Sequence, residues 1–326
     1  MVTEPSALTP SSCVCGECAT VGRTIAARDE VSGEVFGYVT CSACGAQRLS
    51  PRPAPDAIGS YYPDSYASYT VRPDSWGDRL KRLIYLACDS PENHLGPWRA
   101  VLRALLRPLR GHTIFAFEPI APRRVFEFGA ATGNDLALFR NEGWQIAGCE
   151  PSGHARAIAA GRGITLQHAT AEAATLEPCG VSCILINNVL EHTHDPASVL
   201  RKCWSGLVPG GSLVVIVPNH AGLAAWLFGA GWPGYDAPRH LWGFTPRSLD
   251  SAMQATGFLP AVVHPRVQAL WGWRSALIGA RAIAPVAAWR LRWARPLSLP
   301  LLAAGIVAAM FGYGDFMTLV AVKPRN

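Results

Sequence analysis

The sequence of 326 residues has few charged side chains, only 16% of the chain, whereas hydrophobic residues make up 49%. Disordered chains have the opposite balance, so this composition excludes wholesale disorder and predicts a sizeable core. The length suits one large domain with an accessory piece, or two modest domains. The formal net charge of +6 argues only weakly for nucleic acid as a partner, and it is compatible with an anionic substrate or a membrane surface.

Two kinds of apolar segment are also lacking. Residues 1–12 contain an acid and two prolines but no apolar core, so we expect no secretory signal there and a cytoplasmic protein. The most apolar stretch, residues 297–311, has about fifteen residues, fewer than the roughly twenty that span a membrane. In a reducing compartment the ten cysteines are expected to be thiols or metal ligands, not disulfides.

Four of the ten cysteines form two Cys-x-x-Cys pairs that are separated by 22 residues. The predicted metal ligands are Cys15, Cys18, Cys41 and Cys44. Two such pairs are typical of a closed tetrahedral site with a structural zinc ion, and residues 34–40 alternate like a hairpin strand. A redox pair or unligated thiols are the alternative. Cys13 has no evident partner in the sequence.

The chemistry of the chain is predicted to centre on residues 125–133, Val-Phe-Glu-Phe-Gly-Ala-Ala-Thr-Gly. A short apolar run ends in a turn of small residues, and apolar residues with helical spacing follow, which indicates strand, tight turn and helix. Gly129, Ala131 and Gly133 let a nucleotide-like ligand approach the backbone closely. Glu127, near the strand end, offers a carboxylate to hydroxyl or ammonium groups.

A second predicted strand, residues 145–150, ends in Glu150, which lies 21 residues after Gly129. A carboxylate at this place would bind the two hydroxyls of a ribose. Ser152 then caps a helix that runs to Gly161. A dehydrogenase would use similar devices, but the loop lacks the Gly-x-Gly-x-x-Gly pattern of dinucleotide-binding folds.

With these residues in this order, the chain resembles the class I S-adenosylmethionine-dependent methyltransferases. The resemblance implies an α/β fold with a Rossmann-like, doubly wound sheet of seven strands. It also implies that S-adenosylmethionine is bound by Glu127, Gly129, Ala131, Gly133 and Glu150. Ala131 stands where glycine is usual, and it should suit the ligand only if the loop needs no positive backbone angle there.

Two further positions match the cofactor site of that family. After a third predicted strand, residues 164–167, Thr170 and Ala171 correspond to the adenine contact, although the customary acid is displaced or missing. After a fourth strand, residues 181–187, Asn188 stands where the family often has histidine.

Two segments resemble the catalytic region of this family. Val-Leu-Glu-His at 189–192, followed by Asp-Pro, is one of the more specific local resemblances to it, and His192 would lie beside the reacting methyl group. The segment 236–244 matches bacterial methyltransferases that also carry a cysteine ribbon, the methyltransferase-23-like group. Some relatives that methylate carbon on deoxysugar nucleotides have a catalytic histidine there within Tyr-x-Glu-His. His240 occupies the position of this histidine, whereas Ala237 and Arg239 stand at the positions of the tyrosine and the glutamate.

His240 is our first choice for a general base, and His192 is the second. For both residues the alternative is a hydrogen-bonded packing histidine. Arg239 either binds a phosphate or carboxylate or pairs with Asp236. The tyrosines of residues 61–69 either flank the acceptor pocket or pack the ribbon onto the main domain.

We expect five segments in the chain. Residues 1–50 form a zinc-ribbon-like module, and residues 51–115 a linker with two covering helices. Residues 116–265 form the S-adenosylmethionine-binding catalytic domain. Residues 266–314 form an apolar helical insert that is rich in arginine and tryptophan and has no acid, and residues 315–326 the final strand.

The insert has two predicted roles. It either lies on the inner face of a membrane as an interfacial segment or forms a lid buried on its own sheet or on a second subunit of a homodimer. The expected activity is methyl transfer to a small-molecule, sugar or lipid-linked acceptor, with nucleic acid an improbable partner. The alternatives are an NAD-dependent oxidoreductase and a ribbon-based binding protein with a degenerate α/β domain.

Overall fold

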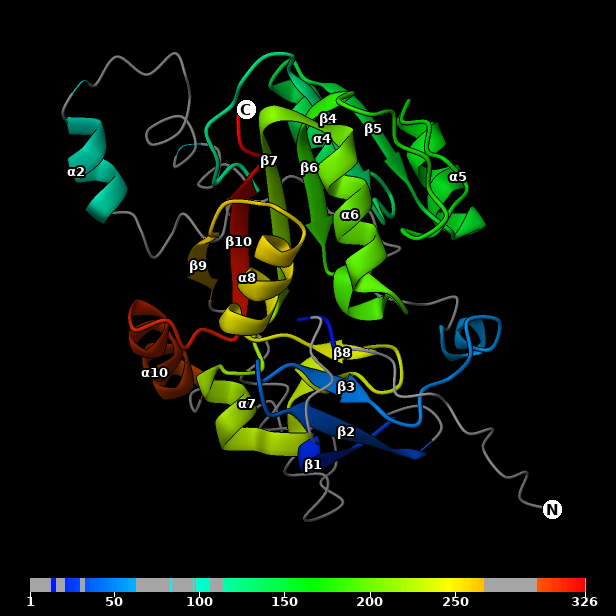
Figure 1. Cartoon of the computed structure of the whole chain (residues 1–326), viewed down its shortest axis with the longest axis vertical. Helices are drawn as coiled ribbons and strands as arrows, with labels where there is room; N and C mark the ends of the chain where they lie inside the picture. Colours follow the sequence, from blue (N-terminus) through cyan, green and yellow to red (C-terminus); the bar gives the residue numbers. More distant parts are fainter. Residues whose placement is uncertain are drawn as a thin grey trace.

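The computed structural model describes residues 13–15, 21–29, 33–62, 83, 96, 98–105, 114–266 and 298–325. In these residues a six-stranded sheet with helices on both faces lies next to a smaller four-stranded sheet (Figure 1). The strand β6 (Val181–Asn187) points its carboxyl end toward the small sheet. Ligands bind at the carboxyl ends of parallel strands in open α/β sheets, so the small sheet adjoins the edge where a site is expected.

The large sheet has the strand order β5-β4-β6-β7-β10-β9. Its other strands are β4 (Arg124–Phe128), β5 (Gln145–Cys149), β7 (Leu207–Pro218), β9 (Val262–Arg266) and β10 (Phe316–Val322). Strands β5, β4, β6 and β7 are parallel, whereas β10 pairs antiparallel with both β7 and β9. This mixed, parallel-rich α/β sheet agrees with the predicted fold class.

The predicted third strand, residues 164–167, is not formed. Only an isolated parallel bridge joins Gln167 to Cys149, supported by backbone hydrogen bonds of 2.9 and 3.0 Å. The side-chain amide of Gln167 then donates to the carbonyl of Thr175 and accepts from its N–H, so the chain turns away from the sheet at once. The described residues therefore form six strands in this sheet, not seven.

Alternate residues along the strands belong to different core clusters, as the two-residue period of a strand requires. Phe126 and Ile184 pack with α6 (Pro196–Gly206) and α8 (Pro246–Ala255). Val125 and Leu185 pack on the opposite face with α4 (Asn134–Asn141) and α5 (Gly153–Gly161). The sheet is thus covered on both faces, which confirms the doubly wound arrangement.

Side-chain caps begin α5, α6 and α8, and the cap at Ser152 confirms the predicted helix start. The side chains of Ser152, Asp195 and Thr245 each accept a hydrogen bond from the backbone N–H three residues later. A proline occupies the first turn of both α6 and α8, where its missing N–H is not needed.

The small sheet has the order β1-β2-β3-β8 and is antiparallel throughout. Its strands are β1 (Val21–Arg28), β2 (Val35–Cys41), β3 (Gln47–Leu49) and β8 (Trp242–Gly243). β8 belongs to the segment that follows His240, so the N-terminal module completes its sheet with a strand from the predicted catalytic domain.

The remaining elements lie outside the two sheets. They are η1 (Ile58–Tyr61), α2 (Trp98–Leu105), η3 (Leu190–His192), α7 (Leu223–Phe228), η4 (Gly229–Gly231), η5 (Pro233–Tyr235) and α10 (Ser298–Met310). Of the first of the two predicted covering helices, only Leu83 is described, and its side chain is exposed. In the second, Trp98 and Val101 of α2 are exposed, so these apolar side chains do not cover the sheet as expected.

The predicted insert is described only in part. Of the insert, residues 267–297 lie outside the described residues, and α10 accounts for much of the rest. Within the described ranges, no helix has both the length and the apolar character to span a membrane.

Candidate functional site

The loop after β4 turns through the left-handed backbone region at every second residue. The φ angles are +63° at Gly129, +47° at Ala131 and +72° at Gly133. A side chain at Gly129 would place its Cβ 2.4 Å from a methyl of Val189, and at Gly133 2.8 Å from a methyl of Ile164. Glycine is therefore required at both positions for space as well as for backbone angle.

Ala131 departs from its expected conformation. The sequence argument required that this position avoid a positive angle, and that condition is not met. An L-residue held there loses about 1 to 2 kcal/mol relative to the right-handed region. The N–H of Ala131 donates to Oε2 of Glu150 at 2.9 Å, and this charge-assisted hydrogen bond helps to hold the loop in place.

The two predicted cofactor carboxylates lie on one face of the sheet. Glu127 in β4 is opposite Gly148 in β5, and Glu150 follows Gly148 by two residues, so alternation directs both side chains to the same side. Only 3% of Glu127 and 4% of Glu150 are exposed. Burial raises the pKa of Glu150, and hydrogen bonds from the N–H groups of Ser152 and Ala131 oppose this rise.

Glu150 retains the capacity to bind a ribose. Each of its oxygens accepts one backbone hydrogen bond, Oε1 from Ser152 at 2.8 Å and Oε2 from Ala131 at 2.9 Å. A carboxylate oxygen can accept two hydrogen bonds, so each oxygen can take one hydroxyl more. The donor set and the small-residue loop thus fit S-adenosylmethionine.

A chain of polar side chains at the ends of β4 and β6 was not predicted. The amide of Asn187 donates to Oδ2 of Asp135 at 2.6 Å, and the amide of Asn188 donates to Oδ1 of Asn187 at 3.0 Å. Asp135 is in the first turn of α4, directly after the glycine loop. An acid in the first turn after such a loop is the sequence signal that could have identified it.

The predicted adenine positions differ from each other. Ala171 is buried, whereas Thr170 is exposed and accepts a hydrogen bond from the N–H of Ala173. The nearby acid Glu172 accepts a hydrogen bond from the N–H of His194 at 2.8 Å. Glu172 therefore fixes a neighbouring loop here, and the adenine contact stays a prediction.

The two predicted catalytic histidines lie side by side next to Glu191. The ring centroids of His192 and His240 are 4.7 Å apart, and Nε2 of His240 is 4.0 Å from Oε1 of Glu191. The N–H of Leu241 donates to the carbonyl of Glu191 at 2.7 Å, which ties the two segments together. Because Val189 contacts the glycine loop, this cluster lies close to the predicted cofactor site.

Backbone carbonyls fix how each ring is protonated. Nδ1 of His192 lies 2.9 Å from the carbonyl of Arg239, and Nδ1 of His240 lies 2.7 Å from that of Gly234. Carbonyls only accept hydrogen bonds, so we assign the ring proton to Nδ1 in both cases, which leaves Nε2 with its lone pair.

Burial controls the charges of this cluster. It lowers the pKa of His192 to about 3, with a further contribution from His240, and it also lowers the pKa of His240. Burial raises the pKa of Glu191 to about 8, and the charge of Asp236 adds to this rise. Both rings are therefore neutral at neutral pH.

Arg239 joins the histidine loop to the small sheet. Its Nε and Nη2 donate to the carboxylate of Asp236, and Nη1 lies 3.2 Å from Oδ1 of Asp29. Nη1 also donates to the carbonyl of Tyr61 at 3.1 Å. Only 5% of Arg239 is exposed, so pairing within the chain, not capture of an external anion, describes this residue.

The comparison with protein families matches residues 98–261 to the family described as "Methyltransferase domain". That range is half of the chain and contains the glycine loop, both carboxylates and both histidines. The chain belongs to this family. This agrees with the resemblance to the class I S-adenosylmethionine-dependent methyltransferases that the motifs implied.

Among curated proteins, the methyltransferase is 32% identical over 113 residues to a ubiquinone biosynthesis O-methyltransferase from Ralstonia nicotianae. The match covers 32% of this chain and 48% of that protein, so the chain spans about half the length of this relative.

Two solved structures are also similar. One, from Thermotoga maritima, is described as a methyltransferase and possible histamine N-methyltransferase. It is 17% identical with a TM-score of 0.46, and the match covers 69% of this chain and 96% of that protein. The other, phosphoethanolamine N-methyltransferase 2 from Haemonchus contortus, has 18% identity and a TM-score of 0.44 and covers 76% of this chain and 57% of its own. Neither likeness bears on the acceptor.

The two described tyrosines of residues 61–69 differ in their surroundings, and the role beside an acceptor pocket stays a prediction. Tyr61 packs edge-on against Phe36 of β2, with ring centroids 6.1 Å apart, and its hydroxyl donates to Glu34. The hydroxyl of Tyr62 instead lies 2.9 Å from Nδ1 of His192. Tyr66 and Tyr69 lie outside the described residues.

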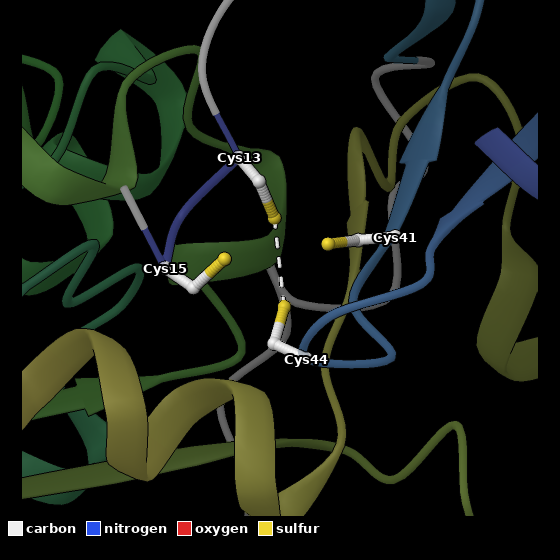
Figure 2. Close-up of side chains that lie close together, drawn as sticks. All are labelled: Cys13, Cys15, Cys41 and Cys44. Carbon is white, nitrogen blue, oxygen red and sulfur yellow. Dashed lines mark hydrogen bonds between the residues drawn. The ribbon is translucent and has the colours of Figure 1, made fainter. Parts of the chain in front are cut away.

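Four cysteines of the methyltransferase converge, but the set differs from the predicted one. Figure 2 shows the sulfur atoms of Cys13, Cys15, Cys41 and Cys44 pointing toward a common centre. The expectation that Cys13 has no partner was wrong, because its Sγ lies 3.5 Å from Sγ of Cys44. Cys18 lies outside the described residues. Tetrahedral zinc with Zn–S bonds of about 2.3 Å separates its sulfur ligands by about 3.8 Å, so the cluster fits zinc.

Proposed function

We propose that the methyltransferase transfers a methyl group from S-adenosylmethionine to a small-molecule, sugar or lipid-linked acceptor. The single observation that supports this most is the pair of buried carboxylates, Glu127 and Glu150, on one face beside the left-handed loop. Bound S-adenosylmethionine supplies a methyl group on a sulfonium. The acceptor's lone pair attacks the methyl carbon and displaces the sulfur, which leaves with the electrons of the carbon–sulfur bond. Loss of the acceptor's proton completes the reaction.

In this proposal each predicted cofactor residue has a defined task. Glu150 accepts hydrogen bonds from the ribose, and Glu127 faces the ammonium end of the methionine moiety. Gly129, Ala131 and Gly133 bring the backbone close to the ligand. The side chains of Asn188, Thr170 and Ala171 complete the site around the adenosine.

We further propose that a ring nitrogen of His240 or of His192 assists removal of the acceptor's proton. Both rings direct Nδ1 to a carbonyl, so Nε2 is the atom available to substrate. A neutral imidazole accepts a proton in its simplest catalytic role, and the lowered pKa values keep both rings neutral. The remaining rate enhancement comes from alignment and exclusion of water.

A structural zinc ion in the cysteine cluster is part of the proposal. Four thiolates form a closed site that stabilises the fold and leaves no position for substrate. The zinc would hold the turn at residues 13–15 against β2 and the turn that follows it.

We also propose that the surface formed by α7 and α10 contacts lipid and thereby suits a lipid-linked acceptor. The two helices lie side by side in Figure 1, and the N–H of Leu223 donates to the carbonyl of Tyr313. The exposed fractions are 79% for Trp226, 67% for Met310 and 74% for Phe311. Residues 267–314 contain five arginines and no acid, which favours an anionic membrane surface.

Calorimetric titration with S-adenosylmethionine and, separately, with NAD tests the proposed activity class. We expect binding of S-adenosylmethionine alone. Glu150→Ala should weaken that binding by about 2 to 4 kcal/mol, because it removes charge-assisted hydrogen bonds to the ribose. Glu177→Ala is the matched control, since Glu177 is exposed. Unchanged affinity in a folded Glu150→Ala protein would contradict the assigned ribose site, and binding of NAD would favour the oxidoreductase alternative.

The acceptor class is tested with labelled S-adenosylmethionine in a cell lysate, counting lipid and water-soluble fractions separately. The proposed lipid contact predicts that label enters the lipid fraction. Label confined to the water-soluble fraction would instead assign a free small molecule or sugar, and the α7–α10 surface would then need a second copy of the chain as its partner.

A further inference from the structure

Glu191 is the least satisfied buried charge-bearing side chain near the histidines. Only 1% of the residue is exposed, and neither carboxylate oxygen has a hydrogen-bond partner among the described residues. Burying a carboxylate without a partner costs several kcal/mol, so such groups are normally paired or bound to a metal ion. We propose that Glu191, His192 and His240 form a binding site for one divalent transition-metal ion of the zinc type, distinct from the cysteine cluster.

The two rings have the arrangement of metal-ligating histidines. A ligating histidine usually donates its other ring N–H to a carbonyl or carboxylate, which fixes its orientation and tautomer. His192 does so to the carbonyl of Arg239, and His240 does so to that of Gly234. Their Nε2 lone pairs are thereby left for a cation.

The distances allow coordination after the side chains move together. One ligand atom from each of the three residues lies within 4.8 Å of the other two. Tetrahedral metal bonds of about 2.1 Å place two ligand atoms about 3.4 Å apart, so the side chains must close by up to about 1.4 Å. Asp236 also approaches Nε2 of His240, with Oδ2 at 4.0 Å, but Arg239 already binds its carboxylate. We therefore place Asp236 outside the ligand set.

Three protein ligands leave at least one coordination position open, which is typical of catalytic sites. This inference rests on the proposed function, and it narrows the acceptor to one that offers a hydroxyl. A hydroxyl bound to the cation loses its proton to solvent more readily. The resulting oxygen attacks the sulfonium methyl carbon, and the carbon–sulfur bond breaks with its electrons left on sulfur. Nε2 of His240 then acts as a ligand and not as the base itself.

Cobalt(II) titration of the purified full-length protein tests the site, because thiolate-bound cobalt has a sulfur-to-metal charge-transfer band that nitrogen and oxygen ligands do not produce. We expect one equivalent of cobalt to bind with d–d bands and without added thiolate charge transfer. Glu191→Gln and His240→Gln should each weaken this binding by about tenfold or more. His154→Gln is the matched control, because His154 is exposed on α5.

The calorimetric affinity for S-adenosylmethionine, measured on each variant, shows whether it is folded. Cobalt binding only with thiolate spectra, or equal affinity in wild type and a folded Glu191→Gln protein, would overturn the site. A wild-type protein that binds cobalt but not S-adenosylmethionine would instead overturn the proposed function, and the proposed metal site would still be supported.

Discussion

The surroundings of His220, which lies two residues after the end of β7, assign it to packing. Its Nδ1 lies 2.9 Å from Oε1 of Gln47 in β3, and its ring lies edge-on to Trp232 and Tyr235. Burial lowers the pKa of His220 to about 3, and the charge of His240 adds to this effect. His220 thus connects the large sheet to the small one as a neutral donor.

This burial makes the stability of the protein depend on pH. The folded-state pKa of His220 is below the unfolded value of about 6.5, so the unfolded chain takes up the proton first as the pH falls. The contribution of neutral His220 to the free energy of unfolding is fully present above pH 6.5. It is lost as the pH falls below this value, by at most about 1.4 kcal/mol per pH unit. We expect His220→Gln, which keeps a donor toward Gln47, to lose less stability than wild type between pH 7.5 and 5.5.

Urea unfolding at the two pH values measures this difference. His154→Gln, with an exposed histidine removed, should keep the wild-type pH dependence. The same pH dependence in His220→Gln and wild type would show that folding does not lower the pKa of His220.

At the scale of elements, α6 holds the turn that carries the predicted adenine positions. Nζ of Lys202 donates to the carbonyls of Ala171, Glu172 and Ala174 at 3.1, 2.6 and 2.6 Å. Three carbonyls around one ammonium fix the end of this turn against the helix. The pattern of α6 did not reveal it, because a lysine on a helix face is normally solvated.

Lys202→Met should lower the free energy of unfolding by about 1.5 to 3 kcal/mol, since the carbonyls lose charged hydrogen bonds while the aliphatic stem is kept. Denaturant unfolding monitored by circular dichroism is the measurement. Arg201→Met is the control on the same helix: its pair with Asp195 spans 3.7 Å between side chains that are 64% and 58% exposed, and such pairs contribute little. Equal effects of the two substitutions would contradict the role of Lys202.

At the scale of the whole molecule, the small sheet supports the loop that carries His240. The buried hydroxyl of Tyr38 in β2 lies within hydrogen-bond distance of the carbonyls of Tyr235 and His240. Asp29 pairs with Arg239, and the N–H of Leu49 donates to the carbonyl of Leu241. The N-terminal module is thus a support for the candidate catalytic loop.

Loss of the proposed zinc should therefore loosen this loop before it disturbs the cofactor site. We expect Cys13→Ser to lower the zinc content and to increase amide hydrogen exchange across residues 234–241, because the small sheet loses its cross-link. Exchange across β4, β5 and β6 should change much less.

Metal analysis together with hydrogen-exchange mass spectrometry tests this. Cys179→Ser, which removes an exposed thiol, should leave both quantities unchanged. Full zinc content in Cys13→Ser would assign the fourth ligand to Cys18 instead.

Local sequence determined the parts of this methyltransferase that depend on neighbouring residues. The caps at Ser152, Asp195 and Thr245 are set within one turn, since a side-chain oxygen meets an N–H three residues on. The strand, small-residue loop and helix around Gly129 follow from short-range periodicity. The order of these units was enough to predict the family, and it also predicted the two carboxylates that we propose bind the cofactor.

Tertiary structure decided what depends on residues distant in sequence. It brought His240 next to Glu191 and His192, placed Cys13 in the thiolate cluster and added β8 to the small sheet. It also ended the predicted strand at residues 164–167 after one bridge and gave Ala131 a positive angle. Spacing rules describe only residues that share a helix face or a strand, whereas these contacts arise where two packed segments must satisfy each other's buried polar groups.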